Sequence, residues 1–193
     1  MSYYRQYIDH LHEALTALPD EAIEQGLELI WEAREKGRSV YVIGNGGSAS
    51  TGSHMACDLG KGASVPGHRR LRIVNLADNM AHFSAIANDF SYEDVFVEQL
   101  ENLLQEGDVL VGISASGNSP NAVKAFEYGR QQGAKVIGLL GFTGGKMKAL
   151  ADVVIHVPSD EYGPVEDAHL IVNHIWTQEL RRRVEEEGKA MNG

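Results

Sequence analysis

Apolar residues recur along the chain with two different periods, which predict helices near the N-terminus and buried strands after them. In Tyr3–Ala17 the apolar side chains repeat at helical spacing, and a second helical pattern covers Asp20–Lys36. Pro19 interrupts the first pattern and Gly37 follows the second, as expected where helices end. The sequence therefore predicts two N-terminal helices before the first strand.

Five short apolar runs then alternate with longer segments. Each run is nearly continuous in apolar residues, as in parallel strands buried on both faces of a sheet, and each connection is long enough for a crossover helix. A last helix is expected over Pro164–Glu187. The expected strands are Ser39–Ile43, Leu71–Leu76, Val109–Ile113, Lys135–Leu140 and Val153–Val157. This alternation predicts an α/β fold, with a flavodoxin-like, doubly wound, five-stranded parallel sheet and two extra N-terminal helices.

Length and composition fit one domain. The chain has 193 residues, of which 43% are hydrophobic and 23% charged, and no apolar run approaches the roughly 18 residues that span a bilayer. We expect a single domain over 1–193, with the N-terminal helices in 1–37 and the α/β core and C-terminal helix in 38–193. Cys57 is the only cysteine and no apolar signal segment opens the chain, so the expected location is the cytoplasm.

The charge balance narrows the range of partners. Lys and Arg number 17 against 27 Asp and Glu, which gives a formal charge of −10 at pH 7. Such a chain has no long-range attraction for nucleic acid or for an anionic membrane, so we expect neither as a partner. An anionic ligand would have to be held by backbone and hydroxyl dipoles or by a few local cations.

Two loops rich in glycine and serine follow the first and third expected strands. The first reads GNGGSAS from Gly44, and the second reads SASGNSP from Ser114. Small residues between a strand and a helix allow backbone N–H groups and hydroxyls to surround an oxyanion at the helix N-terminus. In a sheet of order 2-1-3-4-5 these loops face each other at the topological switch point. Together they predict a phosphate site.

The first loop also fits the GxGxxA form of the dinucleotide fingerprint. The acidic residue expected about 20 positions later is missing, because residues 64–70 read SVPGHRR. Arg69 and Arg70 could contact a 2′-phosphate, so NADP binding stays open as an alternative. The chain has no GxxxxGK[ST] sequence, which argues against hydrolysis of nucleoside triphosphates.

Five motifs, read together, are specific to one family. They are GNGGS at 44–48, NDF at 88–90, GISASGNSPN at 112–121, GGKM at 144–147 and EDAHLIVNHI at 166–175. With these motifs the chain resembles, over nearly its whole length, the phosphoheptose isomerase family of sugar isomerase (SIS) domains. The resemblance implies interconversion of sedoheptulose 7-phosphate and D-glycero-D-manno-heptose 7-phosphate for surface polysaccharide synthesis. It also implies a homotetramer whose active sites lie between subunits.

The resemblance further implies a site built from both loops and from the later helices. Its substrate-binding positions correspond to Asn45, Gly46, Gly47, Ser48, Asp58, Asn88, Asp89, Ser114, Ala115, Ser116, Ser119 and Glu166. Its metal positions correspond to His54, Asp58, Glu166 and His174, which implies zinc or another divalent ion. Asp58 would be the catalytic base and His174 the partner acid or base.

Two of these positions depart from the family pattern, which usually has glutamate in place of Asp58 and glutamine in place of Glu166. The shorter Asp58 withdraws its carboxylate by about 1.5 Å, and a displacement of about 1 Å can cost on the order of 10²-fold in rate. The added charge of Glu166 would hold a cation and repel an anion. Both departures are consistent with a metal-dependent branch that acts on a related sugar phosphate.

Helical spacing gives a partly independent view of the same residues. His54 and Asp58 are four apart and share one helix face, where they could bind a metal or move protons. Asp167, seven residues before His174, is closer to it in helical phase than Glu166, eight residues before it. Spacing alone favours Asp167 and the resemblance favours Glu166, so both stay open.

The sequence is therefore compatible with two classes of function. The first is an aldose–ketose isomerase, which needs a base near the reacting carbons, an acid near the oxygens and groups that stabilise enediolate charge. The second is a non-catalytic SIS scaffold that binds a sugar phosphate or a replication initiator protein. Scaffold relatives tend to lose acid–base residues, whereas this chain keeps Asp58 and His174. We therefore favour the enzyme.

Overall fold

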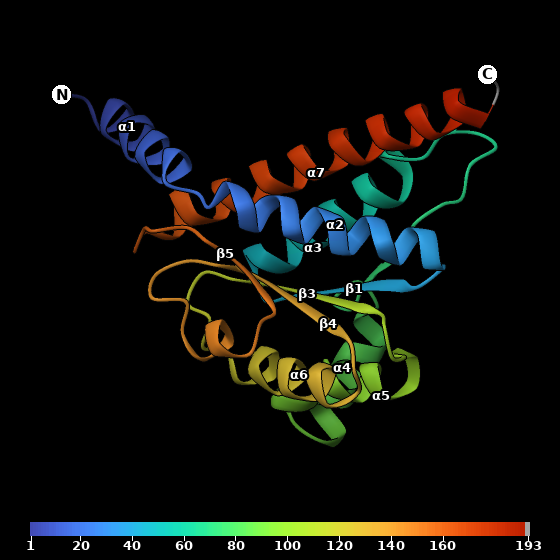
Figure 1. Ribbon diagram of the computed structural model, residues 1–193. Helices are drawn as coiled ribbons and strands as arrows, with labels where there is room; N and C mark the ends of the chain where they lie inside the picture. The colour runs from blue at the N-terminus through green and yellow to red at the C-terminus, as the bar shows by residue number, and fades with distance from the viewer. Residues whose placement is uncertain (192–193) are drawn as a thin grey trace.

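The computed structural model describes residues 1–191, in which a parallel sheet lies between two layers of helices (Figure 1). The strands are β1 (Ser39–Gly44), β2 (Arg72–Asn75), β3 (Val109–Ser114), β4 (Lys135–Leu140) and β5 (Val153–His156). The α-helices are α1 (Tyr3–Thr16), α2 (Asp20–Lys36), α3 (Gly47–Cys57), α4 (Met80–Asp89), α5 (Val97–Leu103), α6 (Pro120–Gln131) and α7 (Tyr162–Met191). Short helical segments are η1 (Asp58–Gly62), η2 (Tyr92–Asp94) and η3 (Lys146–Ala149).

The strand order is β2-β1-β3-β4-β5, and every pairing is parallel. This order confirms the predicted flavodoxin-like sheet, and each predicted strand end lies within one residue of the observed one. The last helix begins before and ends after the predicted bounds. Because β1 and β3 are neighbours, the two loops that follow them start side by side at one edge of the sheet.

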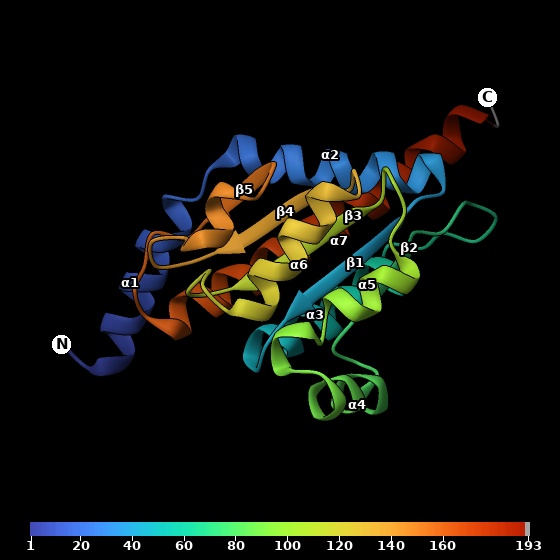
Figure 2. The same ribbon diagram turned by 90° about the horizontal axis from the view of Figure 1, so that it is seen from below.

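Different helices cover the two faces of the sheet (Figures 1 and 2). Val40 and Val42 of β1 pack in a core with side chains of α2, α3 and α7. Tyr41 and Ile43, which alternate with them, pack in a second core with Phe126 of α6 and side chains of α4 and α5. The central strands β1, β3 and β4 are almost continuously apolar because both of their faces are buried, whereas the edge strand β2 exposes Arg72 and Val74.

The long helix α7 is held firmly on the first of these faces. Trp176 is fully buried, and its indole N–H donates to the carbonyl oxygen of Ile23 at 3.0 Å. A Cβ at Gly26 would lie 2.7 Å from the Trp176 ring, so glycine at this position lets α2 and α7 approach closely. No helix within residues 1–191 combines the length and apolar character needed to cross a membrane.

The N-terminal helix α1 is tied to the start of α7. The Tyr7 hydroxyl donates to an Asp167 carboxylate oxygen at 2.6 Å. Burial, followed by this hydrogen bond, raises the pKa of Tyr7 to about 12. Asp167 is therefore engaged with α1, and it does not pair with His174 as helical phase alone suggested.

Candidate functional site

The loops after β1 and β3 meet at a cavity of about 180 Å³. It lies at the N-terminal ends of α3 and α6, where helix dipoles and unpaired N–H groups favour an anion. Its walls consist mainly of small polar residues, and its lining comprises Asn45, Ser48, Ile113, Ser114, Ala115, Ser116, Ser119, Tyr162 and Glu166. Both loops thus contribute to one small polar cavity that is suited to an oxyanion.

Backbone conformation explains the small residues in these loops. Gly46, at the N-cap of α3, has a φ of 55°, and Gly117 has a φ of 63°, a region that disfavours residues with a Cβ. A Cβ at Gly117 would also lie 2.0 Å from the carbonyl oxygen of Gly144, so the GGKM loop packs directly against the second loop. Ser119 occupies the N-cap position of α6, yet its side chain makes no capping hydrogen bond. Its hydroxyl therefore remains available to a ligand.

A pair of amide side chains fixes the spacing of the two loops. Asn45 donates to the Oδ1 atom of Asn121 at 2.9 Å, and Asn121 donates back to the Oδ1 atom of Asn45 at 3.0 Å. The Tyr92 hydroxyl donates to the same Asn45 oxygen at 2.9 Å. Sequence reasoning missed Asn121 and Tyr92, although the NSPN motif contained the asparagine. They matter because they orient a residue of the cavity wall.

Glu166 places a carboxylate in this cavity. A Cβ at Gly47 would lie 2.6 Å and 2.8 Å from the two Glu166 carboxylate oxygens, so glycine at the first residue of α3 makes room for them. The carboxylate thus lies at the N-terminus of α3, where the helix dipole favours negative charge. A bound phosphate would have to share this region with it.

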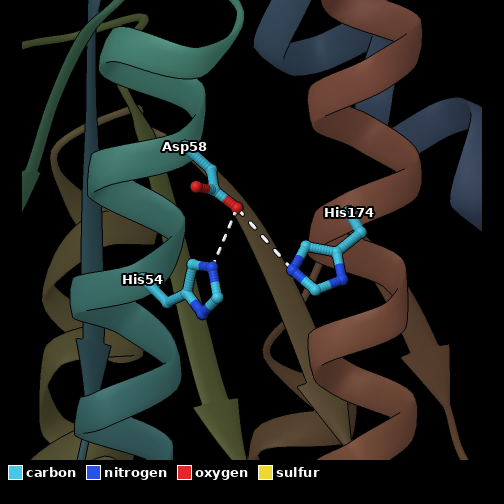
Figure 3. Close-up of side chains that lie close together, drawn as sticks. All are labelled: His54, Asp58 and His174. Carbon is cyan, nitrogen blue, oxygen red and sulfur yellow. Dashed lines mark ion pairs between the residues drawn. The ribbon is translucent and has the colours of Figure 1, made fainter.

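A second cluster of chemically active side chains lies further along α3 and α7 (Figure 3). The Asp58 Oδ2 atom is 3.1 Å from the Nε2 atom of His54 and 3.8 Å from the Nε2 atom of His174. The two imidazole rings are edge to face, with centroids 5.1 Å apart. The side chains are 44%, 24% and 45% exposed for His54, Asp58 and His174, so a ligand can reach all three.

The local backbone and one further residue orient Asp58. It is the first residue of η1, a π-helical turn that continues α3, and such turns are frequent at functional sites. Its Oδ2 atom also accepts a hydrogen bond from the side-chain amide of Asn173, at 3.1 Å. The sequence could place His54 and Asp58 on one face, but it contained no signal for the π-helical turn or for Asn173.

Three other candidate residues, Glu166, Asn88 and Asp89, lie outside the cluster of His54, Asp58 and His174. Glu166 precedes His174 by about 12 Å along α7, and its carboxylate lies at the phosphate cavity, away from the cluster of His54, Asp58 and His174. Asn88 and Asp89 end α4, where they are exposed and bonded to each other at 2.8 Å. They do not line the phosphate cavity.

The cluster of His54, Asp58 and His174 fits a divalent metal. Its candidate ligand atoms all lie within 4.8 Å of one another. Two imidazole nitrogens and a carboxylate oxygen are donors that zinc accepts, and catalytic zinc sites typically use three protein ligands with one position open. Partial exposure of all three side chains leaves such a position accessible.

A buried histidine of α7 makes a pH dependence of stability predictable. His169 of α7 is fully buried, and burial lowers its pKa from 6.5 to about 4. In the unfolded chain the same side chain binds a proton near pH 6.5. The free energy of unfolding should therefore decrease as the pH falls from 6.5 towards 4, by on the order of 2 kcal/mol between pH 7 and pH 5.

Denaturant unfolding at pH 7 and pH 5 checks this expectation. The change His169→Leu should remove that part of the pH dependence, whereas His82→Gln, at an exposed position of α4, should leave it unchanged. Equal pH dependence in the two variants would show that His169 does not contribute.

Comparison with known proteins agrees with this geometry. A profile of the SIS domain matches residues 3–141. The chain is 38% identical over 174 residues to a phosphoheptose isomerase of Helicobacter pylori, covering 89% of this chain and 90% of the relative. Its structure is similar to that of a phosphoheptose isomerase from Neisseria gonorrhoeae, with a TM-score of 0.84 and 30% identity, covering 92% of this chain and 94% of the other. It is also similar to a phosphoheptose isomerase from Francisella tularensis, with a TM-score of 0.85 and 28% identity, covering 93% of this chain and 95% of the other. The chain therefore belongs to the SIS domain proteins and, among them, to the phosphoheptose isomerase family.

Proposed function

We propose that the protein is an aldose–ketose isomerase that converts sedoheptulose 7-phosphate into D-glycero-D-manno-heptose 7-phosphate. The observation that carries this proposal is the placement of an oxyanion cavity and an acid–base cluster on the same two helices, α3 and α7. Glu166 lines the cavity and His174 belongs to the acid–base cluster, and these two residues are about 12 Å apart along the axis of α7. This separation suits a long sugar phosphate better than a three-carbon one.

The phosphate binds at the loops and anchors the reacting end of the sugar. Hydroxyls of Ser48, Ser116 and Ser119, with the backbone around Gly46 and Gly47, donate to its oxygens. Neutral dipoles at two helix N-termini thus bind an anion in a chain whose formal charge is −10. Binding energy from this remote group is used to orient the carbons that react.

Asp58 and His174 carry out the proton transfers in this proposal. Asp58 removes a proton from one of the two reacting carbons, exchanges it with solvent and delivers a proton to the other carbon, so that an enediol lies between the two sugars. His174 transfers a proton between the carbonyl and hydroxyl oxygens of the same carbons. The contact of 3.8 Å between the two side chains places base and acid on adjacent sides of one small site.

We also propose that His54, Asp58 and His174 bind a divalent metal ion, with zinc as the leading candidate. The mixed nitrogen and oxygen donors support zinc. A bound ion would polarise the sugar oxygens and stabilise the negative charge of the enediolate. His54 would then position the ion, and the proton transfers would fall to the atoms of Asp58 and His174 that do not bind it.

Further proposals concern the assembly. The family resemblance supports a cytoplasmic homotetramer with sites completed between subunits, in which Asn88 and Asp89 contact the sugar. Apolar side chains exposed on α1 and α7, among them Tyr3, Tyr4 and Ile175, are consistent with subunit contacts. An open groove of about 560 Å³ along α7 begins beside His174, so a neighbouring subunit could reach the cluster there.

The charge of Glu166 should weaken phosphate binding. In the change Glu166→Gln the side chain keeps its size and loses its charge, so the KM for the sugar phosphate should fall about tenfold. Inhibition by inorganic phosphate should tighten to a similar extent. Glu127→Gln, on the exposed surface of α6, is the matched control and should change neither constant. A higher KM in Glu166→Gln would mean that the carboxylate binds a sugar hydroxyl or a cation.

Isomerisation of a panel of five- to seven-carbon sugar phosphates tests the proposed function. The purified protein should convert sedoheptulose 7-phosphate fastest, and chelation followed by zinc addition should abolish and restore the conversion. The scaffold alternative predicts no turnover with any of these sugars, together with tight binding to a replication initiator protein.

A further inference from the structure

Asn173 lies where a buried helix position would ordinarily be apolar. Its side chain is 0% exposed, and its neighbours on α7 include the fully buried Val172 and Trp176. The amide nitrogen donates to the Asp58 Oδ2 atom at 3.1 Å, whereas the amide oxygen is buried and has no hydrogen-bond partner within residues 1–191. The contact with Asp58 is thus the one polar contact that the described residues give to this side chain.

Such an arrangement is unfavourable for folding. A buried carbonyl oxygen without a partner loses its hydrogen bonds to water and gains none in the protein. An apolar side chain of similar volume avoids this cost, and proteins often retain unfavourable groups where activity requires them. A functional role of Asn173 would therefore act on Asp58, the residue with which it makes its polar contact.

Three groups converge on the same carboxylate oxygen. Besides Asn173, both His54 and His174 point a ring nitrogen at the Asp58 Oδ2 atom. A ring nitrogen donates only in the appropriate tautomer or when protonated, whereas the amide N–H group of asparagine donates at any pH. Asn173 is thus the one permanent donor of the three, and it approaches from the buried side of α7.

We propose that Asn173 is the positioning residue of the proposed active site, and that it fixes the carboxylate orientation of Asp58 between His54 and His174. The short Asp58 side chain would otherwise rotate towards a single histidine and lose the other. Because Asn173 touches neither the sugar nor a metal ion in this arrangement, it acts entirely through Asp58. The inference rests on the proposed function for its kinetic consequence, but its consequence for metal binding does not depend on the sugar.

The change Asn173→Leu separates positioning from structural support. The melting temperature should stay the same or rise, because an apolar side chain replaces a partly unpaired amide. At the same time kcat should fall about 10- to 100-fold with little change in KM, and zinc affinity, measured by calorimetry with zinc alone, should weaken by a similar factor. Thr177→Val is the matched control, because its buried hydroxyl on α7 also has no partner within residues 1–191 but is not among the groups that contact Asp58.

A double-mutant cycle with Asp58→Ala tests whether Asn173 acts through Asp58. In the Asp58→Ala background, Asn173→Leu should have no further effect on zinc affinity. Independent losses from the two changes would overturn the inference, as would a destabilised Asn173→Leu protein with normal kcat and normal zinc affinity. If no sugar phosphate is turned over, the proposed function fails and the zinc titrations still decide the role of Asn173. A wild-type protein with neither turnover nor zinc binding would overturn both.

Discussion

The change Asp58→Asn should lower kcat for sugar-phosphate isomerisation by about 10³-fold while leaving phosphate binding intact. The amide has almost the same shape as the carboxylate, but it cannot accept the proton from carbon. The phosphate cavity lies at the other end of α3, so the affinity for inorganic phosphate should not change. Steady-state kinetics and phosphate titration of the same protein preparation measure both effects.

Two controls distinguish loss of the base from a general loss of charge or of folded structure. Asp9→Asn, at an exposed position of α1, removes the same charge from the chain and should keep full activity. Thermal unfolding of Asp58→Asn should show a folded protein, because the amide keeps the size of the carboxylate and its oxygen can still accept the hydrogen bond from Asn173. Full turnover in Asp58→Asn would exclude Asp58 from the proton transfer.

The second large effect is expected at the phosphate end of the site. Removal of one hydroxyl in Ser119→Ala should lower kcat/KM by about 10- to 100-fold, because a hydrogen bond to a charged group contributes about 1.5–3 kcal/mol. Helix α6 should be unaffected, since the Ser119 side chain makes no capping hydrogen bond. The affinity for inorganic phosphate should fall with kcat/KM, whereas zinc binding at the distant cluster should not change.

Ser50→Ala provides the comparison for Ser119→Ala. Ser50 lies in the first turns of α3, is exposed and does not line the phosphate cavity. Its removal should leave kcat/KM unchanged. Similar losses in the two variants would indicate that the serines act on loop stability and do not contact phosphate.

The fold was predictable because its signals are local and repeated. Both core faces of β1 are apolar, so the sequence showed a nearly uninterrupted run at Ser39–Ile43, and the central strands β3 and β4 behaved in the same way. The two loops were predictable for a related reason. Once β1 and β3 are neighbours, the topology brings Ser48 and Ser119 to one cavity.

The details of the site depend on packing between distant segments, which spacing does not describe. Helical phase favoured Asp167 as the partner of His174, but Asp167 bonds to Tyr7 of α1, some 160 residues away in sequence. The resemblance placed Glu166 with the metal ligands, whereas its position on α7 brings it against Gly47 at the phosphate cavity. Asn173 was missed because one asparagine in a helical pattern does not reveal which side chain it meets.

Deuterium incorporation from solvent tests the proposed proton transfer most directly. The protein is incubated with sedoheptulose 7-phosphate in D2O, with and without added zinc, and the sugars are followed by NMR. We predict formation of the aldose with deuterium at C2, together with deuterium at C1 of the recovered ketose, and neither product with Asp58→Asn. Recovery of unlabelled ketose with no aldose from the folded, zinc-supplied wild-type protein would contradict the assignment as an isomerase.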